Sequence, residues 1–139
     1  MNVWRPEAID RTKADWSDRP DHFEGKVGRL ELGTTAEGVQ VLAVFFEAGA
    51  RTLPHIHMND QVLQCIDGEG IVSVDVPDQG RPRVVRIEAL DTIRIPMGTW
   101  HWHGAIRKSP MTHLSILVHD DRDMWEGVEE KDWEAYREE

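Results

Sequence analysis

The sequence predicts an all-β domain, and three observations support this prediction. Between residues 27 and 118 the chain repeats short runs that are rich in Val, Ile and Leu. Gly, Asp and Pro residues of the kind that form tight turns separate these runs. Helical periodicity is confined to the end of the chain. Short strands at this spacing are typical of a β-sandwich or a barrel.

Nine strands are expected in this central segment. They cover residues 27–32, 39–47, 52–57, 62–67, 71–76, 84–89, 92–95, 100–105 and 112–118. Turn signals fall between them at residues 37–38, 67–68, 78–80 and 96–98. The barrel core is therefore expected over residues 27–118.

The two ends are expected to flank this core within a single domain over residues 1–139. Residues 1–26 form an N-terminal arm without a strand pattern. Residues 120–139 are expected to form a short C-terminal helix, because apolar and aromatic residues recur there at roughly helical spacing. Ten acidic and three basic residues lie in this segment. We expect a solvated acidic helix face, with an acidic docking surface as the alternative.

Composition narrows the possible functions. The formal charge of −10, from 16 basic and 26 acidic residues, repels polyanions. We therefore expect no nucleic-acid partner and no membrane association. The longest aliphatic and aromatic run, residues 41–46, is far shorter than the roughly twenty residues of a membrane helix. The first residues lack a signal-peptide pattern, so a cytoplasmic location is expected.

Histidine spacing points to a metal site. His55 and His57 are two residues apart, so a strand would direct both imidazoles to the same face. Gln61 would reach the same point if the chain turns between them and the next strand. His101 could complete the site from a neighbouring strand. The single cysteine, Cys65, excludes a cysteine-based zinc site.

Two further histidines are candidates for catalysis. His103 follows His101 by two residues, so both are expected to point into the barrel, where His103 could act as a general base or acid. His103 could equally well orient a ligand. His113 has two possible orientations, because the sequence does not show which face of its strand is inside. His22 and His119 lie outside this spacing and are expected at the surface.

The spacing of two residue groups resembles the two motifs of the cupin superfamily. The first group is Gly49, His55, His57, Gln61 and Gly68, and the second is Pro96, Gly98 and His101. This resemblance implies a double-stranded β-helix, or jelly-roll barrel. It also implies one divalent metal ion in the mouth of the barrel, commonly held by three His and one Glu.

Three positions depart from the cupin pattern. Gln61 stands at the usual Glu, Leu90 at the usual Gly and Ala105 at the usual Asn. A neutral carboxamide donates less charge than a carboxylate, so the ion would be a stronger Lewis acid. The Gln61 substitution therefore makes oxygenase chemistry a weaker expectation, although it stays open.

A narrower resemblance comes from Gln61 and the segments 101–105 and 111–114. They are similar to small single-domain cupins related to carboxymuconolactone decarboxylase. That group includes cupin-type hydroxynitrile lyases, which bind manganese through three His and one Gln. The resemblance implies the metal ligands His55, His57, Gln61 and His101, with His103 and His113 as catalytic histidines beside the metal.

Together these patterns predict an enzyme that acts on a small-molecule substrate. One divalent transition metal ion per chain, manganese first and iron, nickel or zinc as alternatives, would polarise a carbonyl or hydroxyl group while His103 moves a proton. Lyase or decarboxylase chemistry fits this description. The alternatives are a metal-dependent dioxygenase and a non-catalytic cupin that binds metal or small molecules. A homodimer is expected, because strand edges and six tryptophans favour coverage by a neighbour.

Overall fold

Two antiparallel sheets share one long strand, β5 (Gln61–Val74), in the computed structural model, which describes residues 3 and 5–125. The first half of β5 belongs to one sheet and the second half to the other. The first sheet also contains β2 (Val27–Thr34), β3 (Val39–Phe46), β7 (Thr92–Ile95) and β9 (Met111–Val118). The second contains β1 (Phe23–Glu24), β4 (Arg51–Thr52), β6 (Arg83–Glu88) and β8 (His101–Ala105).

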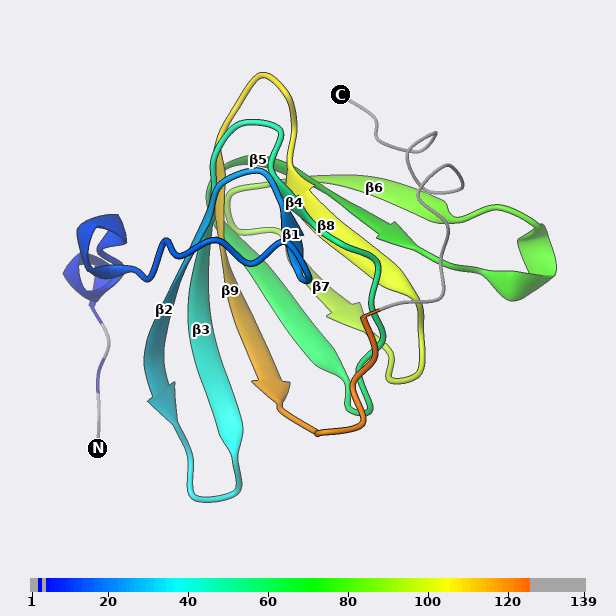
Figure 1. Cartoon of the computed structure of the whole chain (residues 1–139), viewed down its shortest axis with the longest axis horizontal. Coiled ribbons are helices and arrows are strands. Elements are labelled where there is room, and N and C mark those ends of the chain that lie inside the picture. The colour runs from blue at the N-terminus through cyan, green and yellow to red at the C-terminus, as the bar shows by residue number, and fades with distance from the viewer. Residues whose placement is uncertain (1–2, 4, 126–139) are drawn as a thin grey trace.

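The two sheets curl toward each other and enclose the barrel interior (Figure 1). Only short 3-10 helices accompany the strands among the described residues, at Pro6–Ala8, Arg11–Lys13 and Pro77–Gln79. The predicted all-β jelly-roll barrel is therefore confirmed. The described residues include no helix that is long and apolar enough to cross a bilayer.

The predicted break at Asp67 and Gly68 is wrong, because the two strands expected around it form the single strand β5. The register with β9 shifts between Cys65 and Asp67, which marks a bulge. Gly68 has a φ of 78°, and a Cβ atom there would lie 1.9 Å from the carbonyl oxygen of Pro110. Glycine is needed here because the strand bends and β9 approaches it closely. The chain does not reverse its direction at this residue.

The strand predicted over residues 52–57 is also shorter than expected. Regular pairing covers only Arg51 and Thr52 in β4, and His55 and Ile56 form isolated bridges further on. Pro54 lies between the two and has no backbone N–H to donate to a ladder. The expected alternation of side chains along one regular strand therefore does not explain where His55 and His57 lie.

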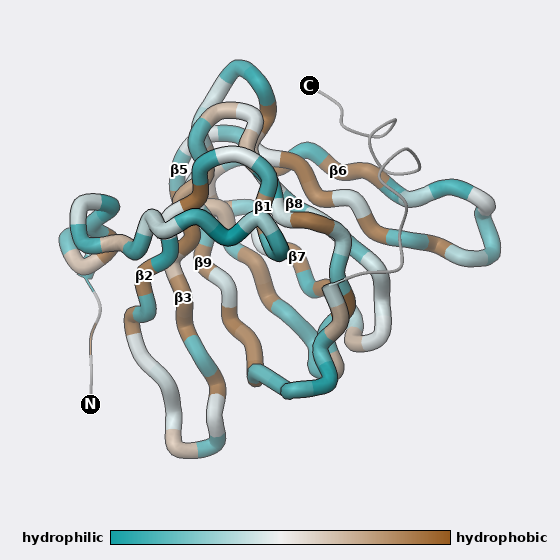
Figure 2. Tube along the Cα trace, in the orientation of Figure 1, coloured by the Kyte–Doolittle hydropathy of each residue, from teal (hydrophilic) through white to brown (hydrophobic). Residues whose placement is uncertain are grey.

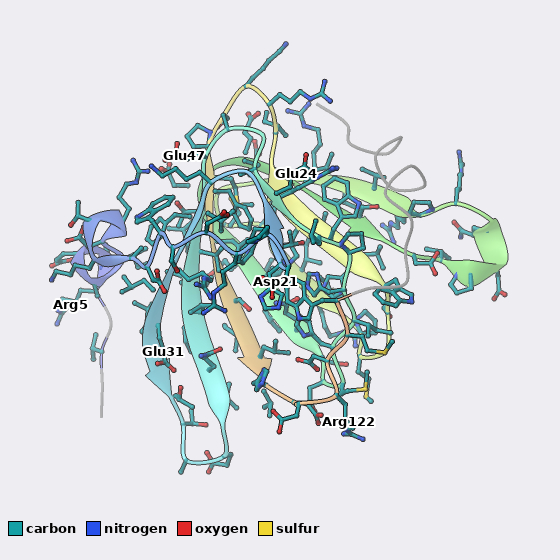
Figure 3. The ribbon with its side chains drawn as sticks, viewed as in Figure 1. Arg5, Asp21, Glu24, Glu31, Glu47 and Arg122 are labelled. Atoms are coloured by element: carbon teal, nitrogen blue, oxygen red, sulfur yellow. The ribbon has the colours of Figure 1, made fainter. Side chains whose placement is uncertain are left out.

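The chain after β9 does not begin a helix where we expected one. Residues 120–125 contain a turn and, at Met124, an isolated bridge to Ile56. The remainder of the predicted C-terminal helix lies outside the described residues. Arg122 lies on this turn, at the end of the barrel opposite Glu47 (Figure 3).

Part of the N-terminal arm continues the first sheet at its β2 edge. Asp15 exchanges backbone hydrogen bonds with Arg29 on β2, at 2.8 and 3.0 Å. Trp16 packs over Gly28 and lies 6.2 Å from the Phe45 ring. The arm thus covers the edge of the sheet that would otherwise be open.

The apolar core fills the interior between the sheets. Phe46, Leu63, Val72 and Ile95 are all at most 2% exposed. Hydrophobic stretches follow the strands, whereas polar stretches mark the loops and the turn after β9 (Figure 2). Five of the buried polar residues in the same interior are histidines, namely His55, His57, His101, His103 and His113. A buried cluster of this kind requires a compensating interaction.

A candidate metal centre in the barrel cavity

A cavity of about 300 Å³ lies inside the barrel. Histidines and polar residues line one part of it, and apolar side chains from β3 and β9 line another part. The cavity reaches the surface at Arg19 and His119, which are exposed. Its wall includes His55, His57, Gln61, His103, His113, Ser115, Asp123 and Trp125.

Backbone pairing places two of the predicted ligands, His55 and His101, side by side. The backbone of His55 exchanges hydrogen bonds with that of His101, at 2.9 and 3.0 Å. Their ring centroids are consequently 4.2 Å apart. The His57 ring lies 4.8 Å from that of His55 and 5.4 Å from that of His101. The three imidazoles therefore form one cluster.

Each of these imidazoles is held through its Nδ1 atom. His55 Nδ1 donates to the carbonyl oxygen of Leu53, and His101 Nδ1 donates to that of Thr99, both at 2.8 Å. His57 Nδ1 donates to the Asp123 carboxylate at 2.9 Å. Carbonyl and carboxylate oxygens only accept, so the proton of each neutral ring lies on Nδ1 and the lone pair on Nε2. This arrangement is the one that metal-ligating histidines commonly have.

Burial keeps these rings neutral. It lowers the pKa of His55 well below the ordinary value, and it lowers the pKa of His101 to about 4. Burial also lowers the pKa of His57, although the hydrogen bond to Asp123 opposes this shift. Neutral imidazoles with free Nε2 lone pairs are what a transition metal ion requires.

Gln61 supplies an oxygen to the same place. Its Nε2 atom donates to Ser115 Oγ at 2.9 Å, which directs Oε1 toward the histidines. Oε1 lies 3.1 Å from His101 Nε2. Both atoms carry lone pairs and no proton, so they repel each other unless a cation lies beside both. The donor set therefore fits a metal ion.

The tightest histidine group includes a residue that the sequence placed beside the metal. His55, His101 and His103 each offer a ring nitrogen within 4.8 Å of the other two. All three are buried and could hold a metal ion. His57 lies outside this group. Within the described residues, His103 Nε2 is buried and has no hydrogen-bond partner.

His103 and His113 form a pair of their own. His103 Nδ1 and His113 Nε2 are joined by one hydrogen bond of 3.0 Å, and both rings are buried. The His113 side chain thus points inward, which resolves the orientation that the sequence left open. Burial lowers the pKa of His103 well below its ordinary value, assisted by the nearby His113. Burial lowers the pKa of His113 to about 4.

The turn after β9 contributes two residues that sequence reasoning missed. Asp123 binds His57, and its second oxygen accepts from the Met58 backbone N–H at 2.9 Å. Trp125 stacks on the His55 ring, with centroids 4.1 Å apart and an angle of 14° between the planes. Neither residue lies at a recognisable spacing from the histidine motifs, so no local signal identified them.

One of the two histidines expected at the surface is instead part of the site. His22 is partly buried, lines the cavity and lies 4.1 Å from the Trp125 ring. The expectation for His22 was therefore wrong, because the N-terminal arm folds back over the barrel mouth. His119 is 71% exposed, as expected.

Comparison with known proteins agrees with this architecture. The cupin domain family matches residues 43–117. An (R)-mandelonitrile lyase from Granulicella tundricola is 34% identical over 134 residues, which cover 94% of this chain and 93% of the lyase.

Solved structures give the same result. A cupin-like protein from Thermotoga maritima is 28% identical with a TM-score of 0.74, over 91% of this chain and 96% of that chain. A polyketide cyclase from Streptomyces resistomycificus shares the fold, with 19% identity and a TM-score of 0.66 over 99% of this chain and 94% of that chain. The chain therefore belongs to the cupin superfamily.

Proposed function

We propose that this cupin is a metal-dependent lyase that acts on a small molecule with a hydroxyl or carbonyl group. The observation that carries the proposal is the convergence of histidine and glutamine lone pairs next to the free Nε2 of His103 in one cavity. The similarity to an (R)-mandelonitrile lyase over nearly the whole chain supports the choice of a lyase.

The residues that would hold the ion are His55, His57, Gln61 and His101. A divalent ion, for which manganese is our first choice and iron, nickel or zinc are alternatives, would polarise the substrate oxygen when bound. Gln61 adds no negative charge, so the ion keeps more of its own charge than it would beside a carboxylate. This property favours polarisation of an oxygen over dioxygen chemistry.

His103 is the residue that we propose moves the proton. It is neutral, and its Nε2 atom is free toward the cavity. With a cyanohydrin, His103 would accept the hydroxyl proton as the carbonyl forms and the carbon–carbon bond breaks. The electron pair of that bond leaves with cyanide, which then takes up the proton that His103 accepted, so HCN forms and the imidazole is neutral again. His113 would share the proton through its hydrogen bond to His103.

The best alternative is a cupin that binds a metal or a small molecule without turnover. The hydrogen bond between His103 and His113 favours it, because a histidine fixed in this way can serve structure alone. The two functions differ in what removal of the His103 ring does. A structural His103 leaves ligand affinity largely intact, whereas a catalytic His103 controls the rate.

The test is release of benzaldehyde from mandelonitrile, followed by ultraviolet absorbance, for protein loaded with each of the four ions. We expect the rate to exceed the buffer rate, and His103→Ala to lower it by about a hundredfold to ten-thousandfold while the metal stays bound. Arg86→Ala is the control, because Arg86 is exposed and lines no part of this cavity. No acceleration with any of the four ions would exclude a mandelonitrile lyase.

A further inference from the structure

Two arginines line the same cavity on the side away from the metal ligands. Arg29 lies on β2, where it pairs with Val44 on β3, and Val44 pairs in turn with His113 on β9. All three line the cavity, so Arg29 and His113 share one face of the sheet. Strands lie about 4.8 Å apart, so two strand spacings put the Cα atoms of Arg29 and His113 roughly 10 Å apart.

The guanidinium of Arg29 is poorly satisfied by the protein. Its side chain is only 16% exposed, and its Nε atom is buried without a hydrogen-bond partner among the described residues. Its ion pair with Asp15 is long at 3.4 Å, and its other neighbour is the uncharged Phe23 ring, 5.7 Å from the guanidinium. A buried cationic donor without a close acceptor is costly.

A second cationic side chain makes binding of an anion at this place more favourable. Arg19 lines the cavity beside Arg29 and is exposed. Burial and the neighbouring Arg19 guanidinium both lower the pKa of Arg29. The carboxylates of Asp15 and Asp21 also act on Arg29 and oppose this shift. Their side chains are 58% and 76% exposed, so they remain hydrated.

The wall between the two ends is largely apolar. Val44 lies between Arg29 and His113 across the sheet, and Leu42, Leu117 and Phe23 also line the cavity. A ligand that fits this wall has an apolar body, an anionic end toward Arg29 and an oxygen toward the histidines. Carboxylate is the anion whose two oxygens match a guanidinium.

We propose that Arg29, assisted by Arg19, forms a carboxylate subsite, and that the substrate is a small hydroxy or oxo acid with its carboxylate remote from the reacting oxygen. This inference rests on the proposed function, because it names the substrate class for the same cavity.

The test compares two probes of similar shape, of which only one carries a carboxylate. 4-Formylbenzoate carries its carboxylate and its carbonyl at opposite ends of one ring, and 4-formylbenzamide replaces the carboxylate by a neutral amide. Isothermal titration calorimetry gives the affinity of each probe for the full chain. We expect the benzoate to bind about tenfold to a hundredfold more tightly than the amide.

Variants of the two arginines test whether these side chains cause the tighter binding of the benzoate. Arg29→Gln should remove most of the preference for the benzoate and leave the amide affinity unchanged. Arg29→Lys should retain a smaller preference, and Arg19→Gln should reduce it less, which keeps the test valid if Arg29→Gln does not fold. Arg86→Gln is the control of equal charge change, because Arg86 is exposed and lines no part of this cavity.

Repeating the titration after removal of metal with EDTA separates this inference from the proposed function. The benzoate preference should persist without metal. Equal affinities of the two probes for the parent would overturn the subsite. A preference that EDTA abolishes and Arg29→Gln leaves intact would also overturn it, since the carboxylate would then bind the metal. Either result leaves the mandelonitrile assay to decide the lyase proposal independently.

Discussion

The barrel contains two sets of buried histidines that differ in how their rings are held. His55, His57 and His101 each donate Nδ1–H to an oxygen that can only accept, so one tautomer is fixed. His103 and His113 are joined to each other, and either nitrogen of that bond can carry the proton. The first set is built to present lone pairs, and the second is built to let a proton move.

This difference assigns roles better than distance does. His103 lies as close to His55 and His101 as a ligand would. The oxygen acceptor that fixes Nδ1 in the other three rings is replaced by His113. We therefore interpret His103 as the proton-moving residue and His57, held by Asp123, as the ligand.

Removal of two anchored histidines should have the largest effect. We expect His55→Ala combined with His101→Ala to reduce the metal content from about one ion per chain to background, because two of four ligands are lost. Elemental analysis of protein purified without added metal or chelator measures this change. His113→Ala is the comparison, and it should keep its metal. Equal metal contents in all three proteins would contradict the division into two sets.

Acid should destabilise the metal-free protein through both sets. The pKa of His101 and that of His113 are lowered to about 4 in the folded chain, whereas the ordinary value is 6.5. Between these values the unfolded chain binds more protons, so stability decreases as the pH falls from about 6.5 to about 4. Each histidine contributes up to about 1.4 kcal/mol per pH unit.

Urea unfolding of the metal-free protein at several pH values in this window measures the slope. His113→Gln should reduce it by the contribution of one histidine. Ser109→Ala, at a loop serine outside the cavity, should leave the slope unchanged. A stability that is flat across the window would show that the buried rings are not neutral.

Loss of the carboxylate behind His57 should have a moderate effect. We expect Asp123→Asn to weaken metal affinity about tenfold to a hundredfold, because partners that orient a ligand typically contribute that much. Competition with a chelator measures the affinity. Asp121→Asn makes the same chemical change at an exposed position in the same turn. If the two variants bind metal equally well, His57 is not held as a ligand.

The smallest change in metal affinity is expected when the hydrogen bond that orients Gln61 is removed. Ser115→Ala removes the acceptor that orients the Gln61 amide. The loss of one such hydrogen bond is about 1 kcal/mol, so metal affinity should fall roughly fivefold. The same chelator competition detects this change, with Ser109→Ala as a control at a loop serine outside the cavity. An affinity equal to that of the parent would indicate that Gln61 does not bind the ion.

The sequence predicted the barrel because strand alternation and turn residues are local signals. Their spacing and the resemblance to cupins grouped His55, His57, Gln61 and His101 as candidate ligands, with His103 beside them. The errors have physical causes as well. Gly68 looks like a turn residue, but it serves a bulge and the close approach of Pro110. Leu90 adopts a φ of 77° at a position where the cupin pattern has glycine.

Other residues of the site are distant in sequence, and no local pattern connects them. Asp123 reaches His57 over 66 residues, and Arg29 reaches the cavity from the opposite edge of the sheet. Such contacts depend on how the turn after β9 and the N-terminal arm close over the barrel. A pattern confined to one element cannot encode that closure.

The turn that contains Asp123 and Trp125 has a consequence for the exchange of ions. Asp123 holds the His57 ring and Trp125 covers a face of the His55 ring, so one segment restrains two of the proposed ligands. A backbone bridge between Met124 and Ile56 fixes this segment next to both. We expect an ion to leave only as often as this turn opens. The ion present while the chain folds would then decide which metal the protein carries, ahead of equilibrium selectivity.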